Sequence, residues 1–291
     1  MTTALAVVFG VGTALSNALA VMAQHVASTA GRRRGWGWLR DVIRHPLWLL
    51  GWIALGGSLV CQSVALHFGP LSLVQPLLVS ELVIALAARR LWRRQRLSPR
   101  AWMSALLTSV ALAGALRLSS PHGGVAPSSR AWVDGVLVTV VVVVALVLAA
   151  RGGSPNRRAA AFATATAVLW AVEATFIKSA TDALLQGGVA GLFRSWTLYA
   201  LVVAGVGGLT TEQLALREGP LRVSQPLIII VDPVVSVIYG LVLFREHLTT
   251  SPAALTLVGL CGVAVVGGVV VMTDAVPETM VPDPGASRRG A

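Results

Sequence analysis

The sequence predicts an all-α polytopic membrane protein, and three observations lead to this fold class: an apolar composition, recurring apolar stretches and a motif that occurs twice. The 291 residues are 55% apolar and 12% charged, with a mean hydropathy of +0.77. A soluble domain of this length cannot bury so much apolar side chain. The apolar stretches reach about 20 residues, enough to cross a bilayer core as helices, and they lack the alternation of transmembrane β-strands.

Nine membrane-spanning helices are expected from these stretches. They cover residues 3–25, 47–67, 70–88, 100–118, 131–150, 159–181, 195–215, 221–243 and 252–272. No Lys or Arg precedes Arg32, so the first stretch is expected to be a retained span rather than a cleaved signal. Residues 273–291 combine Pro with mixed charge and predict a disordered tail.

The distribution of arginine predicts the orientation in the membrane. With the N-terminus outside, eighteen Arg lie in or beside cytoplasmic segments, and only Arg117, Arg130, Arg194 and Arg245 lie outside. This positive-inside bias predicts a plasma or inner membrane protein whose C-terminus is cytoplasmic. It also accounts for the net charge of +11, which therefore indicates contact with anionic lipid headgroups rather than with nucleic acid.

The repeated motif reads GPLSLVQPL at residues 69–77 and GPLRVSQPL at residues 219–227. Between Ala65 and Leu77, eight of thirteen positions match the residues 150 positions later. The matches include Gly, Gln and two Pro, so a shared apolar composition does not explain them. Internal repeats in membrane proteins are typical of transporters.

The two copies are expected to have opposite orientations, because five spans separate the third span from the eighth. The chain therefore predicts two inverted four-helix repeats, residues 1–118 and 159–272, joined by a connector at residues 119–158 that contains span five. Inverted repeats around a midplane site permit alternating access. Span five is almost wholly apolar, so we expect no substrate chemistry on it.

Carboxylates inside the spans are the first candidates for a site, since ionisable residues are costly in a bilayer. Asp232 lies midway along its span, and Glu173 is equally deep. Glu81 lies near the position in span three that corresponds to Asp232, one residue out of register. For Asp232 the alternative is a carboxylate that packs structurally against a polar neighbour, and for Glu81 it is a position deep enough toward the cytoplasm to reach water.

Further candidates for binding substrate or protons are polar residues within the spans: Asn17, Gln24, Gln75, Gln225 and Tyr239. Gln225, Asp232 and Tyr239 are seven residues apart and share one helix face. Gln75 is the repeat counterpart of Gln225. Asn17 and Gln24 also share a face, where they line a cavity or join helices by hydrogen bonds.

Prolines within the motif helices are expected to bend them for gating. Pro76, Pro226 and Pro233 each remove a backbone donor and disrupt the bond to the carbonyl four residues earlier. In the second copy this frees the carbonyls of Arg222 and Ile229 as candidate ligands.

Three other ionisable residues are expected to have structural roles. Lys178 is expected to extend outward to water, with a pairing to a carboxylate on another helix as the alternative. Asp134 lies near enough to a span end to be solvated. Glu212 aligns with Gln62 in the repeat and is expected to hydrogen-bond another helix.

The arrangement resembles the drug/metabolite transporter superfamily, including its EamA-like members. Ala65-Leu66, Gly69-Pro70-Leu71 and Gln75-Pro76-Leu77 are similar to its NIPA-like magnesium transporter branch. Residues 244–248, FREHL, resemble the acidic turn before the last helix of a repeat, whereas residues 94–97, RQRL, carry no acid. The resemblance implies an inverted bundle with a central cavity, and it leaves the substrate open.

Three functions follow as expectations. The first is a secondary transporter for a small polar or cationic solute, with proton coupling as one form, since four carboxylates against one Lys favour a cation. The second is transport of Mg²⁺ or another divalent cation, which prefers oxygen ligands. The third is a scaffold or partner subunit that transports nothing, in which the carboxylates do not converge.

Sequence motifs for other classes of protein are absent. There is no Walker loop, catalytic triad spacing, His/Cys metal cluster or dinucleotide fingerprint. We therefore expect no enzyme activity, no cofactor and no resident metal. Cys61 and Cys261 are expected to fill apolar spans, and a homodimer stays an open alternative.

Overall fold

The computed structural model describes residues 2–30, 46–81, 83–84, 87, 99–219, 221–248 and 251–274. Some side chains within these ranges, that of Gln24 among them, are not described. Residues 275–291 of the predicted disordered tail and the Arg-rich segments at 31–45 and 88–98 lie outside the described residues, whereas residues 273 and 274 are helical.

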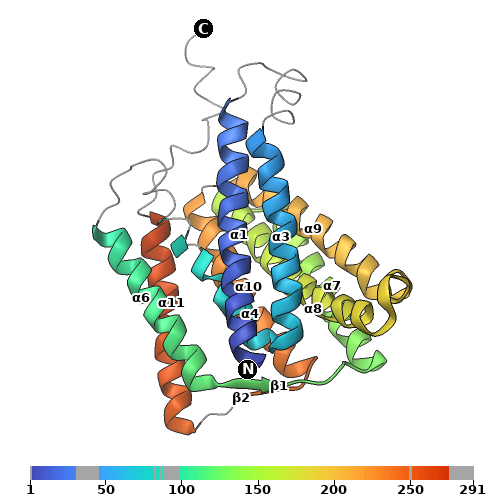
Figure 1. Ribbon diagram of the computed structural model, residues 1–291. Helices are drawn as coiled ribbons and strands as arrows, with labels where there is room; N and C mark the ends of the chain where they lie inside the picture. The colour runs from blue at the N-terminus through green and yellow to red at the C-terminus, as the bar shows by residue number, and fades with distance from the viewer. Residues whose placement is uncertain are drawn as a thin grey trace, which may run out of the picture.

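The described residues form helices joined by short connections, with one pair of short strands (Figure 1). In chain order the elements are α1 (Thr2–Ala30), α3 (Pro46–Phe68), α4 (Leu71–Leu78), α6 (Pro99–Ser119), β1 (Pro121–Gly123), α7 (Ser129–Ala149), α8 (Pro155–Arg194), α9 (Trp196–Glu218), α10 (Leu221–Val242), β2 (Glu246–Leu248) and α11 (Pro252–Asp274). Eight of the nine predicted spans coincide with one of these helices, whereas the span expected at 70–88 matches α4 only over Leu71–Leu78, since the helix is interrupted at Val79. The all-α fold class is thus correct apart from the strands, which were not predicted.

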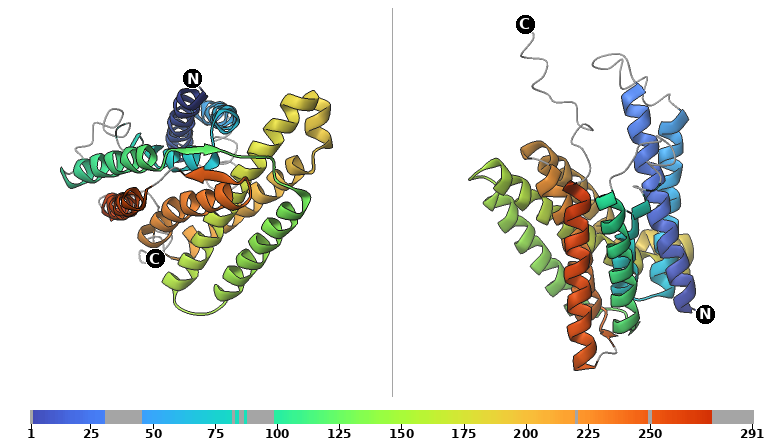
Figure 2. Two further views of the ribbon diagram at one scale, coloured as in Figure 1. Left: turned by 90° about the horizontal axis from the view of Figure 1, so that it is seen from below. Right: turned by 90° about the vertical axis from the view of Figure 1, so that its left-hand side faces the viewer.

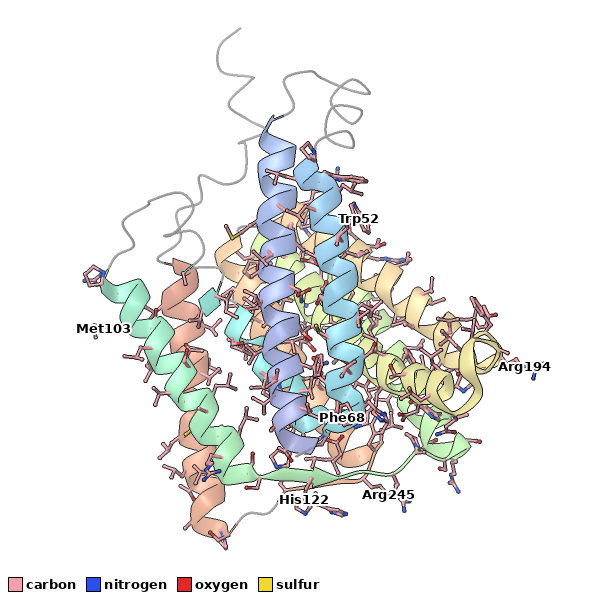
Figure 3. The ribbon with its side chains drawn as sticks, viewed as in Figure 1. Trp52, Phe68, Met103, His122, Arg194 and Arg245 are labelled. Atoms are coloured by element: carbon pink, nitrogen blue, oxygen red, sulfur yellow. The ribbon has the colours of Figure 1, made fainter. Side chains whose placement is uncertain are left out.

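Six of the described helices are long and apolar enough to cross a membrane: α1, α3, α7, α8, α9 and α10. Shorter apolar stretches occur in α6, at Leu106–Ser119, and in α11, at Thr256–Val271. Large apolar side chains face outward, as Trp52 of α3 and Met103 of α6 do in Figure 3. A surface of this kind is expected in lipid rather than in water.

The packing of the first half of the helices has a counterpart in the second half. α1 packs against α3 and α4, and α8 packs against α9 and α10 in the same way. α4 contacts α10, and α6 contacts α11, so the remaining partners also correspond in pairs. This pattern is the one that two similar four-helix halves, residues 1–118 and 159–272, would produce.

α1 begins and α11 ends at opposite ends of the bundle (Figure 1). β1 and β2 lie at the end where α1 begins, and Figure 2 shows β1 crossing that end between α6 and the connection to α7. The strands pair antiparallel, with His122 opposite His247 and Gly123 opposite Glu246. The connection after α6 is therefore held against the turn between α10 and α11. We call this the strand end of the bundle.

The two copies of the motif place their glycines in equivalent close contacts. A Cβ atom on Gly69 would lie 2.5 Å from the Cβ of Ala6 in α1, and one on Gly219 would lie 2.7 Å from the Cβ of Ala159 in α8. Real Cβ atoms essentially never approach so closely. The absence of a side chain at Gly69 and Gly219 therefore lets the chain lie against α1 before α4, and against α8 after α9.

Alanine at either motif glycine is expected to destabilise the protein by about 1–3 kcal/mol, the usual effect of overpacking. The reason is the methyl group, which would push α1 or α8 away from its neighbour. Thermal unfolding of Gly69→Ala and Gly219→Ala in detergent micelles measures the effect. Gly56→Ala is the control, since a Cβ there meets nothing within 4 Å. Wild-type melting temperatures in both motif variants would contradict the packing role.

The prolines act differently in the two copies. α4 ends at Leu78, two residues after Pro76, and the amide of Val79 donates to the carbonyl of Pro76 at 3.1 Å, a tightened turn. α10 stays helical through both Pro226 and Pro233. The helix is therefore interrupted after the proline in the first copy alone. The bending of α10 at Pro226 and Pro233 remains a prediction.

Candidate carboxylate site

The intramembrane carboxylates fall into two pairs. Glu173 of α8 lies near Asp232 of α10, and Glu81, just beyond α4, lies near Glu212 of α9. Glu212 also hydrogen-bonds Trp170, which precedes Glu173 by three residues and so shares its helix face. Through Trp170 and Glu173, α8 is connected with a member of each pair.

Polar neighbours hold three of these acids. Asn17 donates through Nδ2 to Oε2 of Glu81 at 3.1 Å, so Asn17 joins helices by a hydrogen bond. The hydroxyl of Ser236, one turn along α10, donates to Oδ1 of Asp232 at 3.1 Å. The bond from Glu212 to Trp170 confirms the expected contact with another helix.

Glycines of α9 make room for the α8 side chains. A Cβ on Gly205 would lie 3.2 Å from Oε1 of Glu173, and one on Gly208 would lie 3.1 Å from the ring of Trp170. These two glycines are three residues apart and share a face. Both glycines allow close packing of α8 against α9. The side chains that pack against them are the carboxylate of Glu173 and the ring of Trp170.

No basic side chain lies within ion-pair distance of these four acids in the part of the chain that the structure describes. The ion pairs found there join His67 to Asp182, Arg158 to Glu218 and Lys178 to Glu246. Nor do the described residues contain a cluster of three or more His, Cys, Asp or Glu able to hold a metal ion.

Other predicted residues lie outside these two pairs. Gln75 is 2% exposed, and its Nε2 has no hydrogen-bond partner among the described residues. Gln225 is partly buried in α10, and Gln24 lies on α1 with its side chain undescribed. Tyr239 is bonded through its hydroxyl to Thr139 of α7, whose own hydroxyl also lies 2.7 Å from the carbonyl of Gly135.

The hydrogen bond between Tyr239 and Thr139 joins α7, the predicted connector helix, to α10. Tyr239→Phe and Thr139→Val are each expected to destabilise the protein by about 1 kcal/mol, and the double variant by less than the sum, because the two hydroxyls bond each other. Thermal or denaturant unfolding of the four proteins measures the coupling. Additive losses would show that the two hydroxyls stabilise the protein independently.

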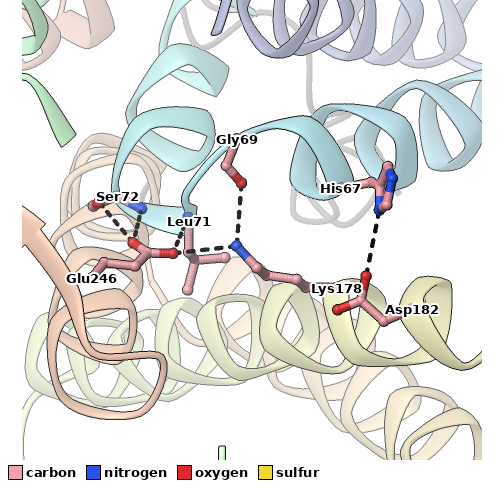
Figure 4. A network of polar contacts seen from close by, with 7 residues as sticks. All are labelled: His67, Gly69, Leu71, Ser72, Lys178, Asp182 and Glu246. Carbon is pink, nitrogen blue, oxygen red and sulfur yellow. Dashed lines mark hydrogen bonds and ion pairs between the residues drawn. The ribbon is translucent and has the colours of Figure 1, made fainter. Parts of the chain in front are cut away.

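Sequence analysis did not identify the most buried charge near the strand end, Glu246. Its side chain is fully buried at the start of β2. It accepts hydrogen bonds from the backbone amides of Leu71 at 2.6 Å and Ser72 at 2.9 Å, and from the hydroxyl of Ser72 at 2.7 Å (Figure 4). Pro70, at the N-cap of α4, has no side-chain oxygen to offer these amides. Glu246 takes that place from the other half of the chain.

Lys178 completes this network, and the expectation that it extends outward to water is wrong. Its Nζ lies 3.3 Å from Oε1 of Glu246 and donates to the carbonyl of Gly69 at 3.2 Å. It also lies 5.1 Å from the ring centre of Phe244, a cation–π contact. The side chain of Lys178 is 13% exposed. The alternative, a carboxylate from outside its own helix, is the one observed, because the buried Glu246 lies within ion-pair distance of Nζ.

The network joins three parts of the bundle at the strand end. α8 contributes Lys178, the turn after α10 contributes Glu246, and the repeated motif contributes Gly69, Leu71 and Ser72 (Figure 4). A hollow of about 370 Å³ lies beside it, and His67 and Asp182 meet there at 3.5 Å. Gly240 approaches the Glu246 carboxylate so closely that a Cβ would collide with Oε2.

Comparisons with known proteins leave the family open. No known protein-family profile matches the chain, and no solved structure matches it. The chain is similar to an uncharacterized protein of Corynebacterium glutamicum, with 26% identity over 246 residues that cover 83% of this chain and 85% of that protein. A match of that length includes parts of both predicted repeats.

Proposed function

We propose that this protein is a secondary transporter that moves a small cationic or proton-coupled solute across the plasma or inner membrane by alternating access. The observation that carries the proposal is the presence of two carboxylate pairs within the predicted spans, Glu173 with Asp232 and Glu81 with Glu212, without a basic partner among the described residues. Charge of one sign inside apolar helices is retained where a cation or proton neutralises it.

The pairing of Lys178 with Glu246 strengthens the choice of a cation. Lys178 is the one Lys of the sequence, and its charge is already matched by Glu246. The acids at 81, 173, 212 and 232 are therefore not balanced by it. An anionic substrate would add to their repulsion, whereas a cation reduces it.

Nine spans, an outer N-terminus and two inverted halves are part of this proposal. They are supported by the arginine distribution, by the opposite ends at which α1 begins and α11 ends, and by the matching contacts of the two halves. In this orientation the strand end faces outward. The Glu246–Lys178 network then closes the bundle on the outside, and it must open when the carboxylates face that side.

A screen in proteoliposomes tests the function. Purified protein is supplied with labelled organic amines, amino acids, nucleosides, sugars and Mg²⁺, each with and without a pH gradient. Uptake of an amine or a proton-coupled solute above that of empty liposomes is the expected result. Uptake of Mg²⁺ alone would replace the organic solute with a divalent cation, and no uptake in any condition would favour a scaffold.

A further inference from the structure

A buried amide in the first copy of the motif has a donor without an acceptor. Gln75 of α4 is 2% exposed, and its Nε2 has no hydrogen-bond partner within the described part of the chain. An unpaired buried donor is less favourable than an apolar group of the same shape. Three other buried polar atoms there also lack a partner: Oγ1 of Thr108, Oγ of Ser224 and Nε of Arg158. Gln75 differs from them in its position, which the packing of α4 on α10 determines.

α4 packs antiparallel to α10, and contacts near its two ends determine the register. Ser72 lies at Gly240, because a Cβ on that glycine would lie 3.3 Å from the backbone nitrogen of Ser72. Val79 belongs to an apolar cluster against which Ile229 packs. Gln75 lies three residues after Ser72 and four before Val79, so it shares their helix face. Gln75 therefore faces α10 between Gly240 and Ile229.

The α10 residues in this interval belong to the carboxylate site. Ser236 is buried one turn before Gly240, and Asp232 lies one turn further, beside the same face. The hydroxyl of Ser236 donates to Oδ1 of Asp232 at 3.1 Å, and Asp232 lies near Glu173. At about 100° per residue, Gln75 and Asp232 fall on the same flank of the antiparallel contact. The register therefore brings an unpaired donor of the first half beside an acid of the second half.

The interruption of the helix beside Gln75 supports a role in binding. α4 ends at Leu78, one turn after Gln75, and the chain is helical again from Ser80. Interrupted helices at the interface of two repeats form the substrate sites of many secondary transporters. Gln75 lies one turn before such an interruption and belongs to the first predicted repeat, whereas Asp232 belongs to the second. A solute between them would contact both halves.

We propose that Gln75 binds an uncharged oxygen of the transported amine while Asp232 binds its ammonium group. The substrate class is then an amine with a hydroxyl or carbonyl oxygen close to its nitrogen, such as an amino alcohol. The oxygen accepts a hydrogen bond from Nε2 of Gln75, and the ammonium donates to the carboxylate.

The chemistry of the site selects this class. A simple alkylamine would leave Nε2 of Gln75 unpaired. An amine that carried a carboxylate instead of the neutral oxygen would be repelled by Asp232 and Glu173. The inference rests on the proposed function and narrows its solute to one chemical class.

Binding of paired amines to the purified protein in detergent micelles tests the contact. The members of each pair differ by a hydroxyl in place of a methyl group: ethanolamine against propylamine, and 2-amino-1-phenylethanol against 2-phenylpropylamine. Dissociation constants follow from the rise of the melting temperature with amine concentration. We expect the wild type to bind the hydroxyl member of at least one pair about tenfold more tightly. Gln75→Met keeps the length of the side chain and should lose this preference, whereas Gln186→Met, at an exposed position of α8, should keep it.

Melting temperatures without ligand separate binding from a structural role. Gln75→Met is expected to unfold at the wild-type temperature or above, because it removes an unpaired donor. A temperature below that of Gln186→Met would show that the amide has a partner inside the protein, and the inference would be wrong.

Three binding results would also overturn the inference. Equal affinities within both pairs for the wild type would mean that water rather than the solute pairs with Nε2 of Gln75. A preference that survives in Gln75→Met would assign the hydroxyl to another residue. Failure of all four amines to bind would exclude the substrate class. The uptake screen measures transport separately, so these results are distinguishable from a failure of the proposed function.

Discussion

Glu246→Ala is expected to destabilise the protein by about 3–5 kcal/mol, because breaking a buried ion pair leaves the other charge without a partner. The variant leaves the ammonium of Lys178 beside the carbonyl of Gly69, and it leaves the amides of Leu71 and Ser72 without their acceptor. Thermal unfolding in detergent micelles, followed by circular dichroism, measures the loss.

A double-mutant cycle separates the ion pair from the capping of α4. Lys178→Met alone removes the cation, and Glu246→Ala with Lys178→Met removes both charges. The double variant is expected to lose less than the sum of the single losses, since no lone charge stays buried. It should still be less stable than the wild type, because α4 has no other cap. Glu218→Gln is the control, and its partly exposed pair with Arg158 is expected to contribute less than about 1 kcal/mol.

If Glu246→Ala unfolds at the wild-type temperature, the network does not stabilise the strand end. A loss equal to that of Glu218→Gln would have the same meaning. Either result would also remove the proposed closure of the bundle on the outside.

Asp232→Asn and Glu173→Gln are each expected to reduce transport by about tenfold or more, the effect of losing a hydrogen bond to a charged group. Both replacements keep the shape of the side chain and remove its charge. Initial uptake rates in proteoliposomes, with the solute found in the screen, measure the effect. The melting temperature should stay near that of the wild type, because no basic partner among the described residues loses a contact.

Asp182→Asn is the matched control for both variants. Asp182 lies on α8 as Glu173 does, but its side chain is 40% exposed and pairs with His67 at the bundle end. Its removal is expected to leave uptake unchanged. If all three variants transport equally, Asp232 and Glu173 have no part in binding. If Asp232→Asn and Glu173→Gln lose stability instead of uptake, these acids are structural.

Much of the helical framework could be predicted from the sequence because long apolar stretches determine it. The span expected at 131–150 became α7 at Ser129–Ala149, and that at 195–215 became α9 at Trp196–Glu218. The span at 159–181 ended a few residues early, since α8 stays helical up to Gly188. Gly188 has a positive φ of 60°, which kinks the chain there, and a second short helical segment runs on to Arg194.

The network around Glu246 could not be predicted from local sequence. Residues 244–248 suggested an acidic turn, but nothing near them identifies a partner 175 residues away. The clue lay in the first copy of the motif, where Pro70 precedes a helix without a capping side chain. A helix start that lacks its own cap requires an acceptor from elsewhere. The strands were also missed, because three residues are too few to show alternation.

The candidate site was predicted in part. Asp232, Glu173 and Glu81 were chosen for their depth, and the structure places each of them near the Trp170–Glu173 turn or beside a partner that contacts it. Trp170 was missed, because an aromatic residue in an apolar helix has no distinguishing pattern. The contact between Thr139 and Tyr239 was missed as well, because a single polar residue in an apolar span does not indicate which residue it contacts.

Counterflow in proteoliposomes tests the central claim most directly. Liposomes that contain the wild-type protein are loaded with unlabelled solute and diluted into a trace of the labelled solute. An alternating-access carrier exchanges the two, so the label should rise inside above its equilibrium level and then decline. The overshoot should be absent with Asp232→Asn and present with Asp182→Asn. Label that only rises to equilibrium would indicate a channel, and label that stays outside would indicate a protein that does not transport this solute.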